Sequence, residues 1–220
     1  MKGDIFHILN RGVEKRNIFL NEKDYLRFTY NLRDFNNKNN VPLSYFHRSH
    51  SKPYGSPTSV KVEDRLIDIL CCCLVTNHFH ILAQEKIDKG AGKFAQKITG
   101  GYTLYFNLKN DRSGVLFQGG SKIISIKRDE HFFYLPFYIL SNPIKLIESQ
   151  WKEKGIKNPR KALEFLENYK WSNLPDLIGK DNFPFTTNKD LFYELFDTNE
   201  KRFRKDFFDW LKAHGRSLRK

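Results

Sequence analysis

The stretch LIDILCCCLVTNHFHILA, residues 66 to 83, predicts the two strands around which the fold is built. Its first ten residues are apolar with one polar exception, a pattern typical of a strand buried on both faces. Thr76-Asn77 predicts a tight turn, and the run from His78 to Ala83 predicts the next strand. We therefore expect a β-hairpin in the middle of a sheet.

Weaker signals on either side indicate further strands and helices. Residues 5–9 read as a first strand, and Asn21 is a plausible N-cap with Asp24 three residues later. Pro136 interrupts a helix that Asp129 is expected to cap, so it either kinks that helix or marks its start. Turn residues fill positions 41 to 64, which predicts a long exposed loop. The other expected elements are helices over residues 22–35, 91–108, 159–169, 189–196 and 201–213 and a strand over residues 122–126.

Composition favours a polyanionic partner. The chain has 220 residues, and 38 Lys and Arg against 25 Asp and Glu give it a formal charge of +13. That balance suits DNA, RNA or an anionic membrane surface. No apolar run approaches the roughly 18 residues of a spanning helix, so membrane binding is disfavoured. The three consecutive cysteines lack disulfide or zinc spacing, and the N-terminus lacks a signal-peptide pattern, so we expect buried thiols and a cytoplasmic protein.

Four polar residues within this apolar sequence suggest chemistry. His78 and His80 share one face of a strand, which makes half of a divalent-metal site. Tyr138 and Asn142 lie one turn apart on a helix, so they can supply a hydroxyl nucleophile and an oxygen ligand. The alternative is that the histidines are half-exposed, the tyrosine is core and Asn142-Pro143 only ends the helix.

Six short segments carry a resemblance to a known family, and they follow one another in the family's order. They are similar to segments of the REP-associated tyrosine transposases, a branch of the HUH superfamily of single-tyrosine, insertion-sequence-200-like transposases. The segments are Asn10–Phe19, Asn77–Leu82, Tyr102–Asn107, Gly114–Gly119, Tyr138–Lys145 and Tyr169–Asn173.

The resemblance implies an α+β fold, with a ferredoxin-like antiparallel sheet and flanking helices over residues 1–150. A basic, helical extension over residues 151–220 would pack on that core. The family acts on single-stranded or hairpin DNA, as a monomer or a homodimer. The resemblance implies that His78, His80 and Asn142 hold Mg²⁺ or Mn²⁺, and that Tyr138 is the nucleophile that forms a covalent 5′-phosphotyrosine.

A phosphate track is expected around this site, and the sequence departs from the family pattern in one part of it. Gly120 and Ser121 stand where the family tends to have an arginine and an aromatic residue, which puts one phosphate contact in doubt. The candidate DNA-binding residues are Arg11, Lys15, Arg16, Lys93, Lys97, Gln118, Lys122, Lys127 and Arg128.

Three functions remain open from the sequence. The first is a metal-dependent enzyme that nicks and rejoins single-stranded DNA through a tyrosine intermediate. The second is a domesticated relative that binds hairpin DNA without cutting it, which the Gly120-Ser121 departure favours. The third is a hydrolytic metallonuclease in which water attacks and Tyr138 only packs.

Overall fold

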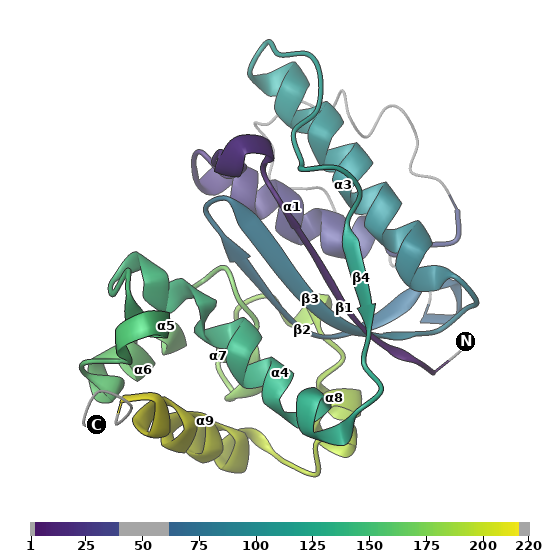
Figure 1. The fold of residues 1–220 in the computed structure, drawn as a ribbon. Coiled ribbons are helices and arrows are strands. Elements are labelled where there is room, and N and C mark those ends of the chain that lie inside the picture. Colours follow the sequence, from purple (N-terminus) through teal and green to yellow (C-terminus); the bar gives the residue numbers. More distant parts are fainter. Residues whose placement is uncertain (1–2, 40–61, 216–220) are drawn as a thin grey trace.

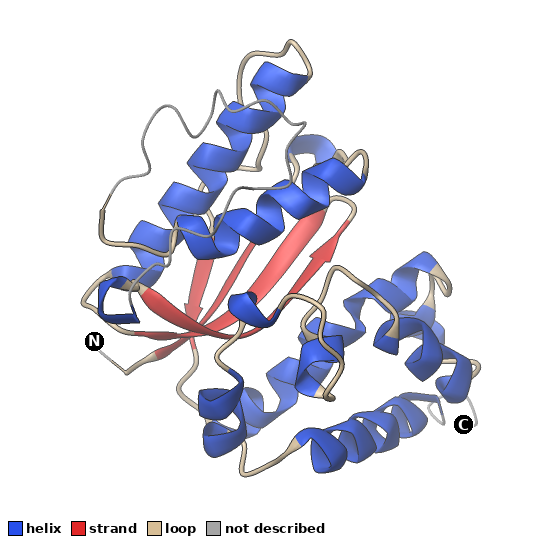
Figure 2. Cartoon of the chain, turned by 180° about the vertical axis from the view of Figure 1, so that it is seen from behind, coloured by secondary structure: helices blue, strands red, loops and turns tan. Residues whose placement is uncertain are grey.

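The computed structural model describes residues 3–39 and 62–215. Residues 40–61, which hold most of the predicted loop, lie outside the described part. The described chain folds into a sheet between two groups of helices, seen from opposite sides in Figures 1 and 2. Among the described residues, no helix combines the length and the apolar character needed to cross a bilayer.

The sheet has four antiparallel strands in the order β2-β3-β1-β4. The strands are β1 Ile5–Arg11, β2 Ile67–Val75, β3 His78–Glu85 and β4 Lys122–Ser125. A tight turn joins β2 to β3, because Val75 pairs with His78. This order and direction confirm the predicted ferredoxin-like sheet.

The position of β2 corrects one prediction, because β2 forms an edge of the sheet and not its middle. All nine of its residues are nevertheless buried. The segment from Trp171 to Asn173 lies along its outer side, where the Leu74 N–H donates to the Trp171 carbonyl (2.9 Å) and the Cys72 N–H donates to Asn173 Oδ1 (2.5 Å). An edge strand that is covered on its outer side needs the same apolar sequence as a central strand. For this reason the sequence of β2 predicted a central position.

One face of the sheet is covered by α1 Glu22–Asp34 and α3 Gly90–Lys109 (Figure 1). The predicted cap of α1 is confirmed, because Asn21 and Asp24 form a capping box. The two helices pack closely, since a Cβ at Gly101 would lie 2.3 Å from the ring of Phe35. Glycine is therefore required for this contact, and α3 continues through it without a break.

The opposite face is covered by α4 Asp129–Ser141 and the C-terminal helices. The consecutive cysteines lie on β2, and all three are buried as predicted: Cys71 and Cys73 in the core on this face, and Cys72 in the core on the other face. The division at residue 150 stays a prediction. The remaining elements are η1 Val13–Lys15, η2 Val62–Asp64, η3 Asn142–Leu146, α5 Trp151–Lys154, α6 Pro159–Glu167, α7 Leu174–Leu177, η4 Pro184–Thr186, α8 Lys189–Leu195 and α9 Glu200–Gly215.

The start of α4 differs in detail from the prediction. Arg128 is the N-cap and Asp129 is the first helical residue, so Asp129 does not cap the helix. Pro136 lies inside the helix, and it does not mark the helix start. The helix therefore extends unbroken from Asp129 to Ser141, with Tyr138 in its last turn and Asn142 as its C-cap.

Candidate active site

The paired histidines lie on the face of the sheet that α4 covers. In the antiparallel register, His80 pairs with Leu9 and His78 pairs with Arg11, while Phe79 joins the core on the other face. The rings of His78 and His80 are 5.1 Å apart between centroids. The prediction that the two imidazoles share one face is therefore confirmed.

The C-terminal end of α4 brings Tyr138 and Asn142 to the same place. The ring of Tyr138 meets the ring of His80 edge to face, with 6.0 Å between centroids. The Asn142 amide nitrogen donates to the Tyr138 carbonyl at 2.8 Å, and the Asn142 side chain lies close enough to His78 to affect its pKa. Tyr138 is half-buried, so its hydroxyl is not hidden in the core. The fold therefore gathers all four predicted residues.

A third histidine, His7 on β1, lies behind this group and was missed by sequence reasoning. His7 Nε2 lies 2.9 Å from His80 Nδ1, and the two rings are stacked. Both side chains are 5% exposed. A hydrogen bond at Nδ1 fixes the orientation of the His80 ring and leaves Nε2 free to bind a ligand.

Burial and neighbouring cations favour the neutral form of these imidazoles. Burial, followed by Arg11, Lys152 and Lys145, lowers the pKa of His78 to about 4, against a smaller opposing effect of the Asn142 hydrogen bond. Burial, followed by His7, lowers the pKa of His80 well below its usual range. His78 Nδ1 lies 2.7 Å from Asn77 Oδ1, so its Nε2 also remains available. Neutral imidazole is the form that binds a metal.

Lys152 of α5 completes the group, and no motif indicated it. Its ammonium nitrogen donates to the Tyr138 hydroxyl oxygen at 3.1 Å and to Asn142 Oδ1 at 3.2 Å. It also lies 4.4 Å from the centre of the Tyr138 ring. Lys145, which affects the pKa of His78, was missed as well. The site is therefore rich in positive charge.

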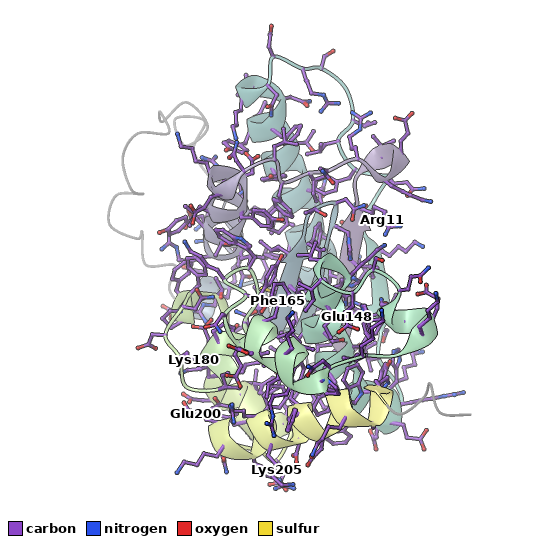
Figure 3. The ribbon with its side chains drawn as sticks, turned by 90° about the vertical axis from the view of Figure 1, so that its left-hand side faces the viewer. Arg11, Glu148, Phe165, Lys180, Glu200 and Lys205 are labelled. Atoms are coloured by element: carbon purple, nitrogen blue, oxygen red, sulfur yellow. The ribbon has the colours of Figure 1, made fainter. Side chains whose placement is uncertain are left out.

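The basic turn over residues 11–16 is hydrogen-bonded to the β2-β3 hairpin, which carries His78. The Gly12 N–H donates to the Asn77 carbonyl at 2.9 Å, and the Asn77 amide donates to the Lys15 carbonyl at 3.0 Å. The turn is tight at Gly12, where a Cβ would lie 2.3 Å from the Arg16 carbonyl oxygen. These bonds hold Arg11, Lys15 and Arg16 at the His78 end of β1. Figure 3 shows Arg11 away from α9, along which Glu200 and Lys205 lie.

The other predicted DNA-binding residues divide into three groups. Gln118 and Lys122 lie near Arg11, since the Gln118 N–H donates to the Arg11 carbonyl and Lys122 pairs with Leu9. Their position suits a contact with a strand that enters the site. The second group, Lys93 and Lys97, lies on α3, which covers the face of the sheet opposite to the candidate site. The third group, Lys127 and Arg128, follows the end of β4 that is farther from Arg11.

The Gly120-Ser121 segment, where the sequence departs from the family pattern, is tied to β1. The side-chain amide of Asn10 donates to the Ser121 hydroxyl at 3.3 Å and to the Gly119 carbonyl at 3.2 Å. This segment therefore serves as a structural connection to β1. Its effect on DNA affinity stays a prediction.

The donor atoms fit a divalent cation. Within residues 3–39 and 62–215, no group of three or more His, Cys, Asp and Glu side chains is arranged to hold a metal. A site here would combine two neutral imidazoles with the Asn142 oxygen, a mixed set that Mg²⁺ or Mn²⁺ accepts with phosphate oxygens as further ligands. That amide oxygen already faces a cation, the Lys152 ammonium.

Comparison with known proteins gives limited similarity. No protein-family model matches the chain, and no curated protein matches it in sequence. A solved chain described as "Structure of the REP associates tyrosine transposase bound to a REP hairpin" has 13% sequence identity and a TM-score of 0.46 over 84% of this chain and 86% of that chain. Similarity at this level does not establish a family.

Proposed function

We propose that this protein nicks single-stranded DNA and transfers the cut strand, as a transposase does, through a covalent 5′-phosphotyrosine at Tyr138. The observation that carries the proposal is the meeting of Tyr138 with His78, His80 and Asn142. These residues come from a strand and a helix that are some sixty positions apart in sequence. The resemblance of the six short segments to REP-associated tyrosine transposases supports the same activity.

His78, His80 and Asn142 would hold Mg²⁺ or Mn²⁺ through two ring nitrogens and one amide oxygen. When bound, the metal would polarise the phosphate and stabilise the charge that gathers on it. The protein prepares this set in advance, because His7 orients His80 and Asn77 orients His78. The neutral state of the imidazoles suits them to this role.

Tyr138 would attack the phosphorus as its hydroxyl loses a proton. A bond forms between Tyr138 Oη and phosphorus, the bond to the 3′ oxygen breaks, and that oxygen takes up a proton to leave as a hydroxyl. The phosphotyrosine ester keeps the bond energy of the phosphodiester. A second 3′-hydroxyl can therefore reverse the step and join a new strand, without an external energy source.

The positive end of the sheet would bind the DNA backbone. Arg11, Lys15, Arg16 and Lys122 gather around the His78 end of β1, and phosphate contacts by such residues position a strand without reading its sequence. A single strand is the better substrate, because in-line attack needs an exposed and bendable backbone. The resemblance to the family further suggests that the DNA substrate contains a hairpin.

A covalent-adduct assay tests the proposal. Hairpin oligonucleotides with a labelled, randomised single-stranded flank are incubated with the protein and Mn²⁺, and a denaturing gel reveals DNA that migrates with the protein. We expect an adduct that Tyr138→Phe abolishes. Tyr134→Phe is the matched control, because Tyr134 is one turn earlier on α4, 42% exposed, and stacked on Tyr138 with 6.0 Å between centroids.

Two outcomes would contradict the proposal. Cleavage without an adduct would show that water attacks and that the protein is a hydrolytic nuclease. Binding of the hairpins without cleavage would show a non-catalytic binder. Omission of Mn²⁺ in the presence of EDTA tests the metal separately, and we expect the adduct to be lost.

A further inference from the structure

Lys152 is the one residue of the described chain whose ammonium contacts both Tyr138 and Asn142 through their side-chain oxygens. It also affects the pKa of both His78 and His80, so its charge lies close to all four predicted site residues. The cation is therefore at the centre of the group and not at its rim.

The fold holds Lys152 in place although α5 is only four residues long. The neighbouring Trp151 is 5% exposed, and its ring packs edge to face on Trp210 of α9 at 6.3 Å. Trp151 belongs to the same apolar cluster as Leu135 and Ile139 of α4. The short helix is thus anchored to both α4 and α9, which sets the distance from Lys152 to Tyr138.

The charge of Lys152 is available to a ligand. Other lysines of the C-terminal part of the chain form ion pairs, such as Lys180 with Glu167 at 3.2 Å and Lys205 with Asp209 at 3.1 Å. Among the described residues, no carboxylate forms an ion pair with Lys152, and its side chain is exposed. An exposed, unneutralised ammonium beside a hydroxyl is well placed to bind an anion that reaches that hydroxyl.

We propose that Lys152 is a catalytic residue that binds a non-bridging oxygen of the phosphate attacked by Tyr138. This inference rests on the proposed function and adds a residue to it. Once the Oη–phosphorus bond forms, the non-bridging phosphate oxygens lie two bonds from Oη, within reach of an ammonium that is 3.1 Å from Oη. Lys152 then holds the negative charge of the phosphate during attack and in the phosphotyrosine ester.

The test compares three variants on oligonucleotides that the wild-type protein converts to the adduct. Lys152→Met should lower the rate of adduct formation at saturating DNA by about 100-fold, the usual cost of removing a group that stabilises developing charge. Lys152→Arg keeps the charge and should recover most of the rate. Lys154→Met is the charge-matched control, since Lys154 is an exposed lysine on the same helix, and its rate should stay within about twofold of wild type.

A binding measurement without metal gives an independent readout. In EDTA, the affinity of each protein for the same oligonucleotide is measured by fluorescence anisotropy at several NaCl concentrations. Lys152→Met should reduce the slope of log K against log salt by about 0.7, the value for one phosphate contact on a single strand. Lys154→Met should leave the slope unchanged.

The inference is overturned if Lys152→Met forms the adduct at the wild-type rate or faster. It is also overturned if the rate falls but the salt slope does not and Lys152→Arg fails to restore activity, because Lys152 would then be structural. Failure of the proposed function looks different, since wild-type protein would form no adduct or Tyr138→Phe would retain it. The salt slope in EDTA still tests the phosphate contact in that case.

Discussion

Replacement of His7 tests whether the buried imidazole pair prepares the site. His7→Leu removes the ring whose Nε2 lies 2.9 Å from His80 Nδ1, and both side chains are buried. An unpaired buried polar group costs about 1–3 kcal/mol. Loss of a residue that orients a metal ligand costs about 10- to 100-fold in affinity or activity, equivalent to about 1.4–2.7 kcal/mol. The first cost applies to the free energy of unfolding. The second applies to the site, and its midpoint of about 2 kcal/mol predicts a loss of about 30-fold in metal affinity.

The assay measures Mn²⁺ affinity by calorimetry and the rate of adduct formation at limiting Mn²⁺. We expect both to fall about 30-fold in His7→Leu, and His7→Gln to recover part of the loss through a side-chain hydrogen bond to His80. His131→Ala is the control, because His131 is exposed on α4 yet near enough to affect the pKa of His7. If His7→Leu matched His131→Ala in both measurements, His7 would have no part in positioning His80.

Three further predictions concern the scaffold. Asn173→Ala should lower the free energy of unfolding by about 3 kcal/mol, because it leaves a buried backbone N–H of β2 unpaired; a urea midpoint close to wild type would show that water takes over the bond. Gly101→Ala places a Cβ 2.3 Å from the Phe35 ring and should lower the free energy of unfolding, measured by thermal unfolding, by about 1–3 kcal/mol. Gly100→Ala, at an open position on the same helix, should stabilise the helix by up to about 1 kcal/mol. Equal effects of the two variants would contradict the close packing of Gly101 on Phe35. Burial is the main cause that raises the pKa of Tyr25 to about 12 from 10.0, so the folded state keeps this proton longer than the unfolded chain and stability is lost as the pH rises from 10 to 12. Tyr25→Phe should remove about 3 kcal/mol of that alkaline loss, and an unchanged pH profile would contradict the assignment.

Much of the fold could be predicted because its main signals are local. The apolar run from 66 to 75 and the Thr76-Asn77 turn predict a hairpin from strand geometry alone. Asn21 and Asp24 predict the start of α1 for the same reason. The edge position of β2 was not predictable, since its outer side is covered by residues 171–173, about a hundred positions away and without a periodic pattern.

The candidate site was predictable only in part. His78 and His80 share a strand face, and Tyr138 and Asn142 share a helix face, so their spacing is visible in sequence. His7 is one residue of an apolar strand, and its contact with His80 spans 73 positions. Lys152 is one of the 38 Lys and Arg residues of the chain, and it lies on a helix of four residues, which is too short to show periodicity. Both depend on tertiary packing, which has no local signature.

The seating of α4 on the C-terminal helices limits how the chain can be shortened. The ring of Phe137 stacks on Phe203 at 5.7 Å, on Phe207 at 6.0 Å and on Trp210 at 6.2 Å, beside the nucleophile candidate. A fragment ending at residue 150 would keep both strand histidines and the tyrosine, yet leave these aromatic contacts open to water. Such a fragment should aggregate on expression, because a large exposed apolar patch promotes association. Residues 151–220, which carry the weakest motifs, thus hold α4, the helix of the nucleophile candidate, in its position on the sheet.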